Sequence, residues 1–318
     1  MERCWRMLAA TAFGAAAISG HALAQGYPDR TVEIVVPTTP GASADLLGRV
    51  LADGLSAQLG QRFIVLNKVG GSGGLGTGSV ASAKPDGYTL MHGAAVSITV
   101  TPLTDPQLRY SHKSFDPICQ TFKNDQVIVV RPDSPYKTVK DIVEAAKAKP
   151  GGVNYGHPGL GTIPHLAMIE LGLVSKVEFN HVPFRGPAEA AQMVHGGQID
   201  FAAVPLTSVA NGGFRMPGLF ANARNPAIPD VPTVKEQGFD VAPLSFGGLV
   251  APAGLPADVK RKLDDGCRAA AQSDAFKRIA KTHLQPDDYY ADSAAFTNSI
   301  ERDVAEKRRL LTSVGFVK

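Results

Sequence analysis

The first third of the chain alternates between short apolar runs and longer segments whose apolar residues recur at helical spacing. The runs have the length of buried strands, and the longer segments have the length of helices. Gly-rich turns join them, an order that is typical of βαβ units around a parallel sheet. We therefore expect strands at residues 32–36, 63–66 and 88–92, and helices at residues 45–59 and 75–83.

The helix at residues 45–59 has well-defined ends. Leu47 and Leu51 lie on one apolar stripe that faces the core. Ser43 is the expected N-cap, and Gly60 suits the left-handed residue that ends a helix. Because a helix start carries free N–H groups and the positive end of the helix dipole, the turn before it predicts an anion-binding site. The alternative is a purely structural turn.

The rest of the chain repeats this order. A Thr138-x-x-Asp141 capping box opens a helix at residues 138–148, so a second α/β domain is expected. Its strands are placed at residues 126–130, 153–155, 177–180 and 199–203. Two amphipathic helices follow, at residues 257–272 and 293–313. The charged residues of the last helix are interpreted as a solvated face: Glu301, Arg302, Asp303, Glu306, Lys307, Arg308 and Arg309.

Residues 1–24 have the features of a secretory signal peptide. Arg3 and Arg6 precede an apolar run, and the sequence ALA that ends at residue 24 matches the small-x-small pattern of a cleavage site. The run is shorter than the ~20 apolar residues that span a bilayer. We therefore expect an exported mature chain of about 294 residues that starts near Gln25.

Charge and cysteine content narrow the choice of partner. The chain has 32 Lys and Arg against 29 Asp and Glu, without a long basic run, which argues against nucleic acid and other polyanions. Cys119 and Cys267 are the only cysteines after the leader. Export permits a disulfide between them, but their separation follows no framework pattern, so buried free thiols are the favoured interpretation.

Two short motifs are compatible with an enzyme and have to be weighed against binding. Residues 71–76 spell G-x-G-x-x-G, but they follow the second strand and no acidic residue ends the third, which argues against a dinucleotide site. Residues 70–74 also fit G-x-S-x-G, with Ser72 as nucleophile and Asp200 and His283 completing a hydrolase triad. The histidines show neither H-E-x-x-H nor a Cys-x-x-Cys companion, so we expect no metal and no other cofactor.

Five Gly-rich loops share one position, directly after a predicted strand: PTTPGAS, GGSGG, HGAAVS, HPGLGT and PFRGP. In parallel sheets such loops gather at the C-terminal edge, where small residues expose backbone N–H groups. Loops of two domains that face each other would hold a small anion through main-chain donors and hydroxyls, without a buried Arg or Lys. Binding therefore accounts for the pattern more simply than catalysis.

The same segments resemble the substrate-binding proteins of tripartite tricarboxylate transporters, often called Bug receptors. The resemblance extends in register over nearly the whole mature chain, through YPDRTVEIVVPTTPGASAD, FIVLNKVGGSGGLGTGSVASAKPDGYTL, PGGVNYGHPGLGTIPHLA, HVPFRGPAEAAQMVHGGQID, PAIPDVPTVKEQG and LVAPAGLP. It implies an α/β fold of the two-lobed periplasmic-binding-protein type (type II), with two mixed sheets flanked by helices and a ligand cleft between the lobes. One lobe would comprise residues 26–124 and 241–318, the other residues 125–240, with crossings near residues 126–130 and 245–251.

The resemblance also implies where a carboxylate binds. Family members hold the proximal carboxylate of a small organic acid, partly through ordered waters, with the loop after the first strand and loops of the opposite lobe. The matching residues here are Thr38, Gly41, Ala42, Ser43, Ala94, Ala95, His157, Gly159, Thr162 and His165. We add Val204, which stands where members commonly carry an acidic residue.

Three departures from the family pattern bear on the ligand. The usual P-F-x-P-G-G is Pro-Thr-Thr-Pro-Gly-Ala at residues 37–42, which predicts a more polar rim. Val204 would leave an amine without its acidic partner, which disfavours amino-acid ligands. The loop HGAAVSITVTP lacks the usual Thr and His. The alternative is neutral drift in a receptor of unchanged specificity.

We therefore expect a periplasmic, monomeric receptor that captures a small carboxylate and delivers it to the membrane subunits of a transporter, without catalysis. The alternatives are a receptor that presents the same ligand to a membrane sensor, and a secreted serine hydrolase.

Overall fold

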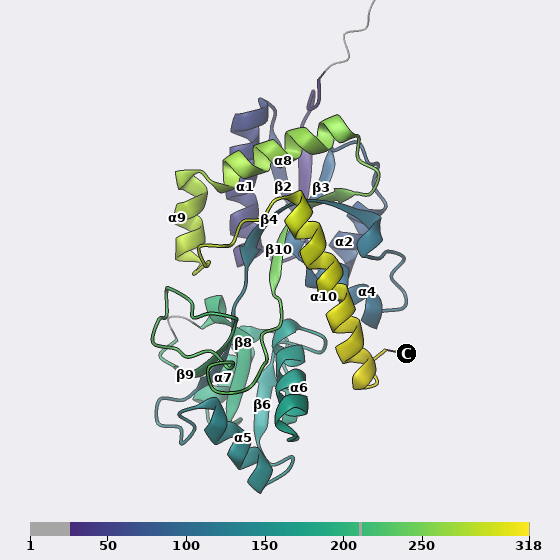
Figure 1. Cartoon of the computed structure of the whole chain (residues 1–318). Coiled ribbons are helices and arrows are strands. Elements are labelled where there is room, and N and C mark those ends of the chain that lie inside the picture. Colours follow the sequence, from purple (N-terminus) through teal and green to yellow (C-terminus); the bar gives the residue numbers. More distant parts are fainter. Residues whose placement is uncertain (1–25, 210–211, 318) are drawn as a thin grey trace, which may run out of the picture.

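Two five-stranded mixed sheets form the centres of two lobes (Figure 1). The computed structural model describes residues 26–209 and 212–317. The first sheet has the order β2 (Phe63–Asn67), β1 (Val32–Val36), β3 (Thr89–Ala94), β10 (Phe246–Pro252) and β4 (Phe115–Lys123). The second has the order β7 (Asn180–Pro183), β6 (Asn154–His157), β8 (Phe201–Pro205), β5 (Gln126–Val130) and β9 (Arg215–Phe220). This is the two-lobed type II fold that the family resemblance implies.

Helices cover both faces of each sheet. On the first sheet, α1 (Ser43–Leu59), α8 (Ala257–Ala271) and α9 (Asp274–Thr282) pack on one face, and α2 (Gly74–Ala81), α3 (Val96–Thr99) and α10 (Ser293–Ser313) on the other. α4 (Thr101–Thr104) follows α3 directly. On the second sheet, α5 (Val139–Ala148) and α6 (Ile163–Ser175) cover one face and α7 (Pro187–His195) the other. Short 3-10 turns lie at Gly71–Gly73, His112–Ser114 and Leu206–Ser208.

Apart from the exposed Glu33, the residues of β1 are apolar and buried, and they pack on both faces of the sheet. Val32, Ile34 and Val36 pack into the cluster beneath α1 and α8, whereas Val35 points to the opposite cluster with α2 and α10. Strands of a sheet that is covered on both sides need apolar residues at successive positions rather than at alternate ones. The predicted strand at residues 32–36 is therefore confirmed, and it lies between β2 and β3 inside the sheet.

Strand direction brings the Gly-rich loops of both lobes to one boundary. β10 begins beside the end of β3, where Gly247 pairs with Ala94, and β1 and β2 run parallel to β3. β5 begins beside the end of β8, where Gln126 pairs with Pro205, and β6 and β7 run parallel to β8. Because β5 and β10 start where the chain passes between the sheets, the C-terminal ends of six parallel strands all lie at that passage.

Most predicted elements lie within a few residues of their observed positions. Asp141 N–H donates to Thr138 Oγ1 at 3.1 Å in the predicted capping box, and Gly60 has a φ of 71°. Two placements were wrong. Ala42 is the N-cap of α1, so Ser43 is already helical, and β7 starts at Asn180, where the predicted strand was to end.

Two further predictions concern the limits of the chain and its lobes. The signal peptide at residues 1–24 and the mature start at Gln25 lie outside the described residues. The lobe boundaries after residues 124 and 240 stay a prediction. Among the helices that the structure describes, none is both long and apolar enough to span a bilayer.

The charged face predicted for α10 is only partly solvated. Asp303 and Lys307 are 1% and 3% exposed and form an ion pair at 3.5 Å. Thr99 of α3 donates to Asp303 Oδ2 at 2.7 Å. The prediction of a solvated face is therefore wrong for these two residues, because α10 packs against α3 at this point and buries them as a pair.

Cys119 and Cys267 form a disulfide, so the expectation of free thiols was wrong. Cys119 lies on β4 and Cys267 on α8, and both are fully buried in the cluster beneath α1. Sequence spacing did not indicate the pair because 148 residues separate them, and the chain passes through the whole second sheet in between. The bond fixes α8 to the sheet.

Breaking this disulfide should destabilise the protein. A cross-link that closes so long a loop restricts the unfolded chain, and losing it costs about 2–5 kcal/mol of unfolding free energy. We expect reductant to lower the melting temperature by several degrees, and a Cys119→Ala/Cys267→Ala variant to melt at the lower temperature with or without reductant. Peptide mapping of unreduced protein that finds the two cysteines unlinked would contradict the assignment.

Candidate functional site

The start of α1 presents open main-chain donors at the boundary between the lobes. The N-cap Ala42 has φ −66° and ψ 156° and makes no side-chain cap. The amides of Ser43 and Ala44 have no hydrogen-bond acceptor among the described residues, whereas Asp45 N–H already bonds Ala42 O at 2.9 Å. These two N–H groups lie at the positive end of the helix dipole, so the helix start can accept an anion.

The loop before α1 is held by the buried carboxylate of Asp45. Asp45 Oδ2 accepts from Gly41 N–H at 2.8 Å and from Arg49 Nε at 3.1 Å, and Oδ1 accepts from Asn67 Nδ2 at 2.8 Å. Burial raises the pKa of Asp45, but the bonds from Arg49, Gly41 and Asn67 outweigh it and leave the pKa below its ordinary value. Asp45 is therefore ionised at neutral pH, and its carboxylate fixes the conformation of the loop before α1.

This network uses two amides that the sequence assigned to the ligand. Gly41 N–H is bonded to Asp45, and Ala42 N–H donates to Thr39 O at 3.2 Å. Gly41 still serves the turn, because its φ of 84° is strained for any residue with a side chain. The free donors are the amide of Ser43, which was among the predicted residues, and that of Ala44, which was not.

His92 supports α1 from below. Its Nδ1 lies 3.0 Å from Ala44 O and its Nε2 lies 2.8 Å from Thr121 Oγ1, which fits a neutral ring that donates to the carbonyl and accepts from the hydroxyl. The side chain is fully buried, and burial lowers the pKa of His92 to about 4. Sequence reasoning missed this residue, because a single histidine at the end of an apolar strand has no distinguishing signal.

The start of α6 is the corresponding element of the other lobe. Thr162 is the N-cap but makes no cap hydrogen bond; its hydroxyl donates to Gly159 O at 2.7 Å instead. The amides of Ile163 and His165 have no acceptor in the described part of the chain, and Pro164 between them has no N–H. A second helix N-terminus with open donors therefore lies at the boundary.

The two lobes touch beside these helix starts. Val100, which lies between α3 and α4, shares an apolar cluster with Leu166 of α6 and Leu311 of α10. A Cβ placed on Gly161 would lie 3.9 Å from Val100 Cγ1. The loop before α6 therefore lies against the segment that follows β3. The ends of β1 and β3 are at the same edge of the first sheet, so the free amides of α1 are on this side of the first lobe as well.

Three other predicted residues contribute less than expected. Ala95 N–H donates to Phe246 O at 2.8 Å and is therefore not free, and Ala94 lies within β3 opposite Gly247 of β10. Val204 is fully buried in the cluster with α7. Its assignment to the ligand was wrong, because β8 turns this side chain into the core, and Val204 therefore does not disfavour amino-acid ligands.

Thr38 remains a candidate of a different kind. Its Oγ1 is buried and has no hydrogen-bond partner among the described residues. Its carbonyl accepts from Asn67 Nδ2 at 3.0 Å, so the loop position is fixed. Because an unpaired buried hydroxyl is costly, a ligand oxygen or a water that reached it would restore a hydrogen bond.

Three histidines meet at the end of the second sheet. The rings of His157 and His165 stack with centroids 4.3 Å apart, and His181 of β7 lies 5.4 Å from His157 and 5.3 Å from His165. Burial lowers the pKa of His157 to about 4 and that of His165 to about 3, and the neighbouring rings add to both effects. The sequence did not point to His181, which is 24 residues away from His157 and becomes its neighbour only when β6 and β7 pair.

The hydrolase alternative finds no support in the partners of its proposed residues. Asp200 Oδ2 accepts from Asn154 N–H at 2.7 Å, within the second sheet. His283 Nδ1 lies 3.1 Å from Ser43 Oγ, at the end of α9 in the first lobe. Asp200 and His283 therefore have separate structural partners in different lobes.

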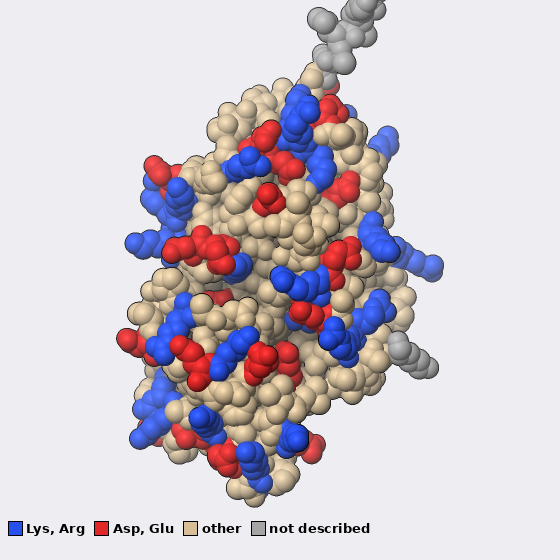
Figure 2. All heavy atoms as spheres, in the orientation of Figure 1, with Lys and Arg blue, Asp and Glu red and all other residues tan. Residues whose placement is uncertain are grey.

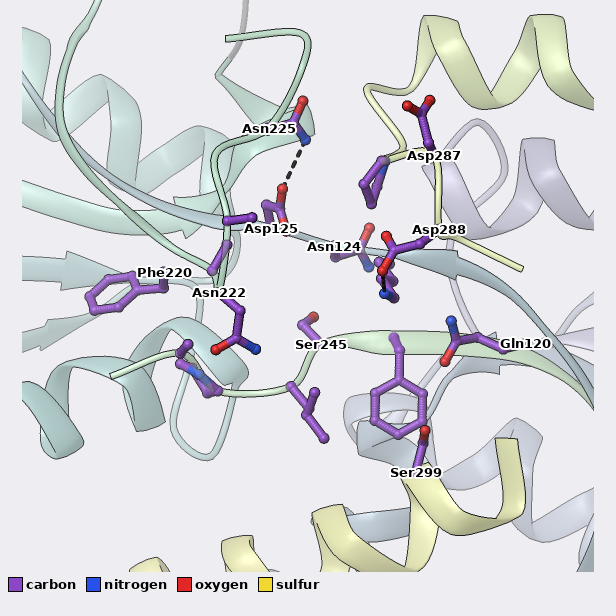
Figure 3. Close-up of a pocket in the computed structure, with 18 of the residues that line it drawn as sticks. Gln120, Asn124, Asp125, Phe220, Asn222, Asn225, Ser245, Asp287, Asp288 and Ser299 are labelled. Atoms are coloured by element: carbon purple, nitrogen blue, oxygen red, sulfur yellow. Dashed lines mark hydrogen bonds and ion pairs between the residues drawn. The ribbon is translucent and has the colours of Figure 1, made fainter. Parts of the chain in front are cut away.

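A cavity of about 600 Å³ lies where the chain passes between the lobes (Figure 3). Asn124, Asp125, Ser245, Asn225 and Asp288 contribute to its wall, and Asn225 Nδ2 donates to Asp125 Oδ2 at 2.8 Å. None of the predicted carboxylate-binding residues lines it. Its wall balances three carboxylates, those of Asp125, Asp287 and Asp288, against the basic side chains of Lys123, Arg224 and Arg302, so it offers an anion no excess of positive charge. We therefore place the candidate site at the helix starts.

Figure 2 shows that acidic and basic side chains are interspersed over both lobes on the face in view. The ion pairs of exposed residues agree with this mixture, as in Arg224 with Glu236 and Lys235 with Asp240. A surface of this kind lacks the single-sign field that attracts polyanions. Together, two lobes, crossing connections and paired helix starts define a solute receptor of the periplasmic-binding type.

Comparison with known proteins specifies the family. Residues 47–316 match the TctC model, described as the tripartite tricarboxylate transporter family receptor. A Cupriavidus necator protein, "UPF0065 protein in gbd 5'region", is 34% identical over 314 residues, which is 98% of this chain and 95% of that one. The chain therefore belongs to the tripartite tricarboxylate transporter receptor family, which includes the Bug proteins.

Solved structures agree. The periplasmic binding protein BugD is 27% identical with a TM-score of 0.77, covering 92% of this chain and 100% of that one. An R. palustris protein solved with adipate is 25% identical with a TM-score of 0.78, covering 91% and 98%. Receptors of this family are periplasmic solute-binding proteins rather than enzymes.

The support that His92 gives to α1 should depend on pH. The unfolded histidine takes up a proton near its ordinary pKa of about 6.5, whereas the folded one does so only near 4. The unfolded state therefore binds more protons between these values, and stability that is complete above pH 6.5 falls as the pH drops toward 4, by roughly 3 kcal/mol from this residue.

Urea denaturation between pH 7.5 and 4.5 measures this effect. The His92→Asn variant keeps a side-chain donor for Ala44 but cannot titrate, so we expect lower stability at pH 7.5 and a smaller loss on acidification than in the wild type. His195→Ala, which removes an exposed histidine of α7, should keep the wild-type slope. Equal slopes for His92→Asn and the wild type would contradict the assignment.

Proposed function

We propose that this protein is an extracytoplasmic receptor that captures a small organic carboxylate between its lobes and delivers it to the membrane subunits of a tripartite tricarboxylate-type transporter. The observation that carries the proposal is the pair of helix starts at the lobe boundary. α1 and α6 each present two amides without acceptors in the described chain, and neither has a side-chain cap.

The chemistry of these donors suits a carboxylate. A charge-assisted hydrogen bond from a neutral amide to an anion is stronger than one between neutral groups, and the helix dipole adds to it. No buried cation is required, so the empty site avoids the cost of an unpaired charge. Four amides from two lobes match an ionised carboxyl group, whose two oxygens accept about four hydrogen bonds.

Family relationship supports the same ligand class. The R. palustris neighbour was solved with adipate, a dicarboxylate, and it shares the fold over most of both chains. We infer that the ligand of this chain belongs to the same chemical class. It would present at least one carboxylate to the helix starts, and the polar rim near Thr38 would face the rest of the ligand.

Location and partners follow from the same assignment. We infer that residues 1–24 direct export, that the mature receptor acts in the periplasm, and that it works as a monomer with a membrane transporter. Catalysis plays no part in this function, since the receptor only has to bind and release its ligand.

Replacing Ser43 by proline tests the amides of α1. Proline removes the N–H at the first helical position, where it is tolerated, and the extended Ala42 before it has the conformation that proline requires. We expect the best carboxylate from a screen of mono-, di- and tricarboxylates to bind about ten- to a hundredfold more weakly by calorimetry, the loss of one charge-assisted bond of ~1.5–3 kcal/mol.

Ser43→Ala is the matched control. It removes the hydroxyl that contacts His283 but retains the N–H, so its affinity should stay near that of the wild type. Thermal melts of both variants report whether the fold is retained. If no carboxylate at millimolar concentration raises the melting temperature of the wild type, or if Ser43→Pro binds as well as Ser43→Ala, the proposed site is wrong.

A further inference from the structure

The three histidines at the end of the second sheet converge from three elements. His157 ends β6, His181 lies on β7, and His165 lies in the first turn of α6. Tyr155 pairs with His181 across the two strands, so His181 and His157, two residues after Tyr155, project from the same face of the sheet. α6 lies over that face and contributes His165.

Their nitrogens are close enough to share one ion. One nitrogen from each ring lies within 4.8 Å of the others, and His157 Nε2 is 3.2 Å from His181 Nδ1. Two nitrogens bound to the same tetrahedral Zn²⁺ at ~2.0–2.1 Å lie about 3.3 Å apart. His157 Nε2 and His181 Nδ1 are therefore already at the separation of two nitrogens that bind one ion.

A main-chain contact orients the first of these ligands. His157 Nδ1 lies 2.8 Å from Gly159 O and 3.3 Å from Gly159 N. Because the carbonyl can only accept and makes the shorter contact, we assign the proton to Nδ1, which leaves the lone pair of Nε2 toward His181. Metal-bound histidines are typically held in this way, with the other ring nitrogen donating to a carbonyl or carboxylate. His165 Nδ1 accepts from Gly161 N–H at 3.1 Å, so this ring must shift its proton or give up that bond to become the third ligand.

The surroundings of the three histidines let an ion reach them from solvent, and their nitrogen donors select which ions can bind. His157 and His165 are buried, while His181 is exposed, so the cluster opens to solvent on one side. All three donors are imidazoles, which suit Zn²⁺, Ni²⁺ and Cu²⁺, whereas Mg²⁺ and Ca²⁺ require oxygen ligands. Three protein ligands leave one coordination position for a water or another oxygen donor.

We propose that His157, His165 and His181 form a binding site for a divalent transition metal ion of the Zn²⁺ class. The sequence did not predict it: the spacing between the histidines follows no metal-binding motif, and strand pairing alone brings His181 to the other two. This inference does not depend on the proposed carboxylate, because it is tested with the metal alone.

Calorimetric titration of the untagged, chelator-treated mature protein with Zn²⁺ tests the site. We expect one ion per chain with micromolar or tighter affinity, a rise in melting temperature with Zn²⁺, and no response to Mg²⁺. Co²⁺ should develop the intense visible absorption of tetrahedral coordination. The His181→Ala variant, which changes an exposed side chain, should weaken Zn²⁺ binding at least about tenfold and abolish the Co²⁺ spectrum.

The control is His195→Ala, an exposed histidine of the same lobe whose ring packs against Phe214 and whose Nε2 lies 3.0 Å from Gly212 O. It should bind Zn²⁺ like the wild type. His157→Ala should lose binding as well, and His181→Ala covers the case in which that buried substitution unfolds the protein. If Zn²⁺ does not bind saturably, or if His181→Ala and His195→Ala bind it equally, the proposal is overturned.

Discussion

The direction in which the chain crosses between the sheets is the constraint on which the site depends. β10 enters the first sheet antiparallel to β3, and β5 enters the second antiparallel to β8. Every parallel strand therefore ends at the crossing, and the loops that start α1 and α6 meet there. A reversal of either crossing strand would send the same loops to opposite ends of the molecule.

The first of these loops is held in shape by charge and by a buried ring. Gly41 N–H donates to the carboxylate of Asp45, which lies in the first turn of α1. The positive end of the α1 dipole therefore has one negative partner within the lobe and can have a second in a bound ligand. His92 holds the carbonyl of Ala44 on the other side of the turn. The donors of Ser43 and Ala44 are thus positioned before any ligand arrives, which reduces the ordering cost of binding.

The fold was predictable from the sequence, whereas the site was predictable only in outline. Apolar runs such as β1, the capping box of α5 and Gly60 carry local signals that packing did not override. The Gly-rich loops identified the correct edge of each sheet. Which amides are free could not be predicted, because Asp45 and β10 take those of Gly41 and Ala95 through tertiary contacts. The disulfide and His181 were missed for the same reason.

The helix α10 joins the two lobes in a way that bears on their motion. Its first turns are anchored on the first sheet through Phe296 and Ile300, while Leu311 packs with Leu166 of α6, and Phe316 just beyond the helix packs against His165. Separating the lobes would strip these apolar contacts from α6 and expose them to water, at roughly 25 cal/mol for each Å². The C-terminal segment therefore adds to the free energy needed to separate the lobes, and it does so with or without a bound solute.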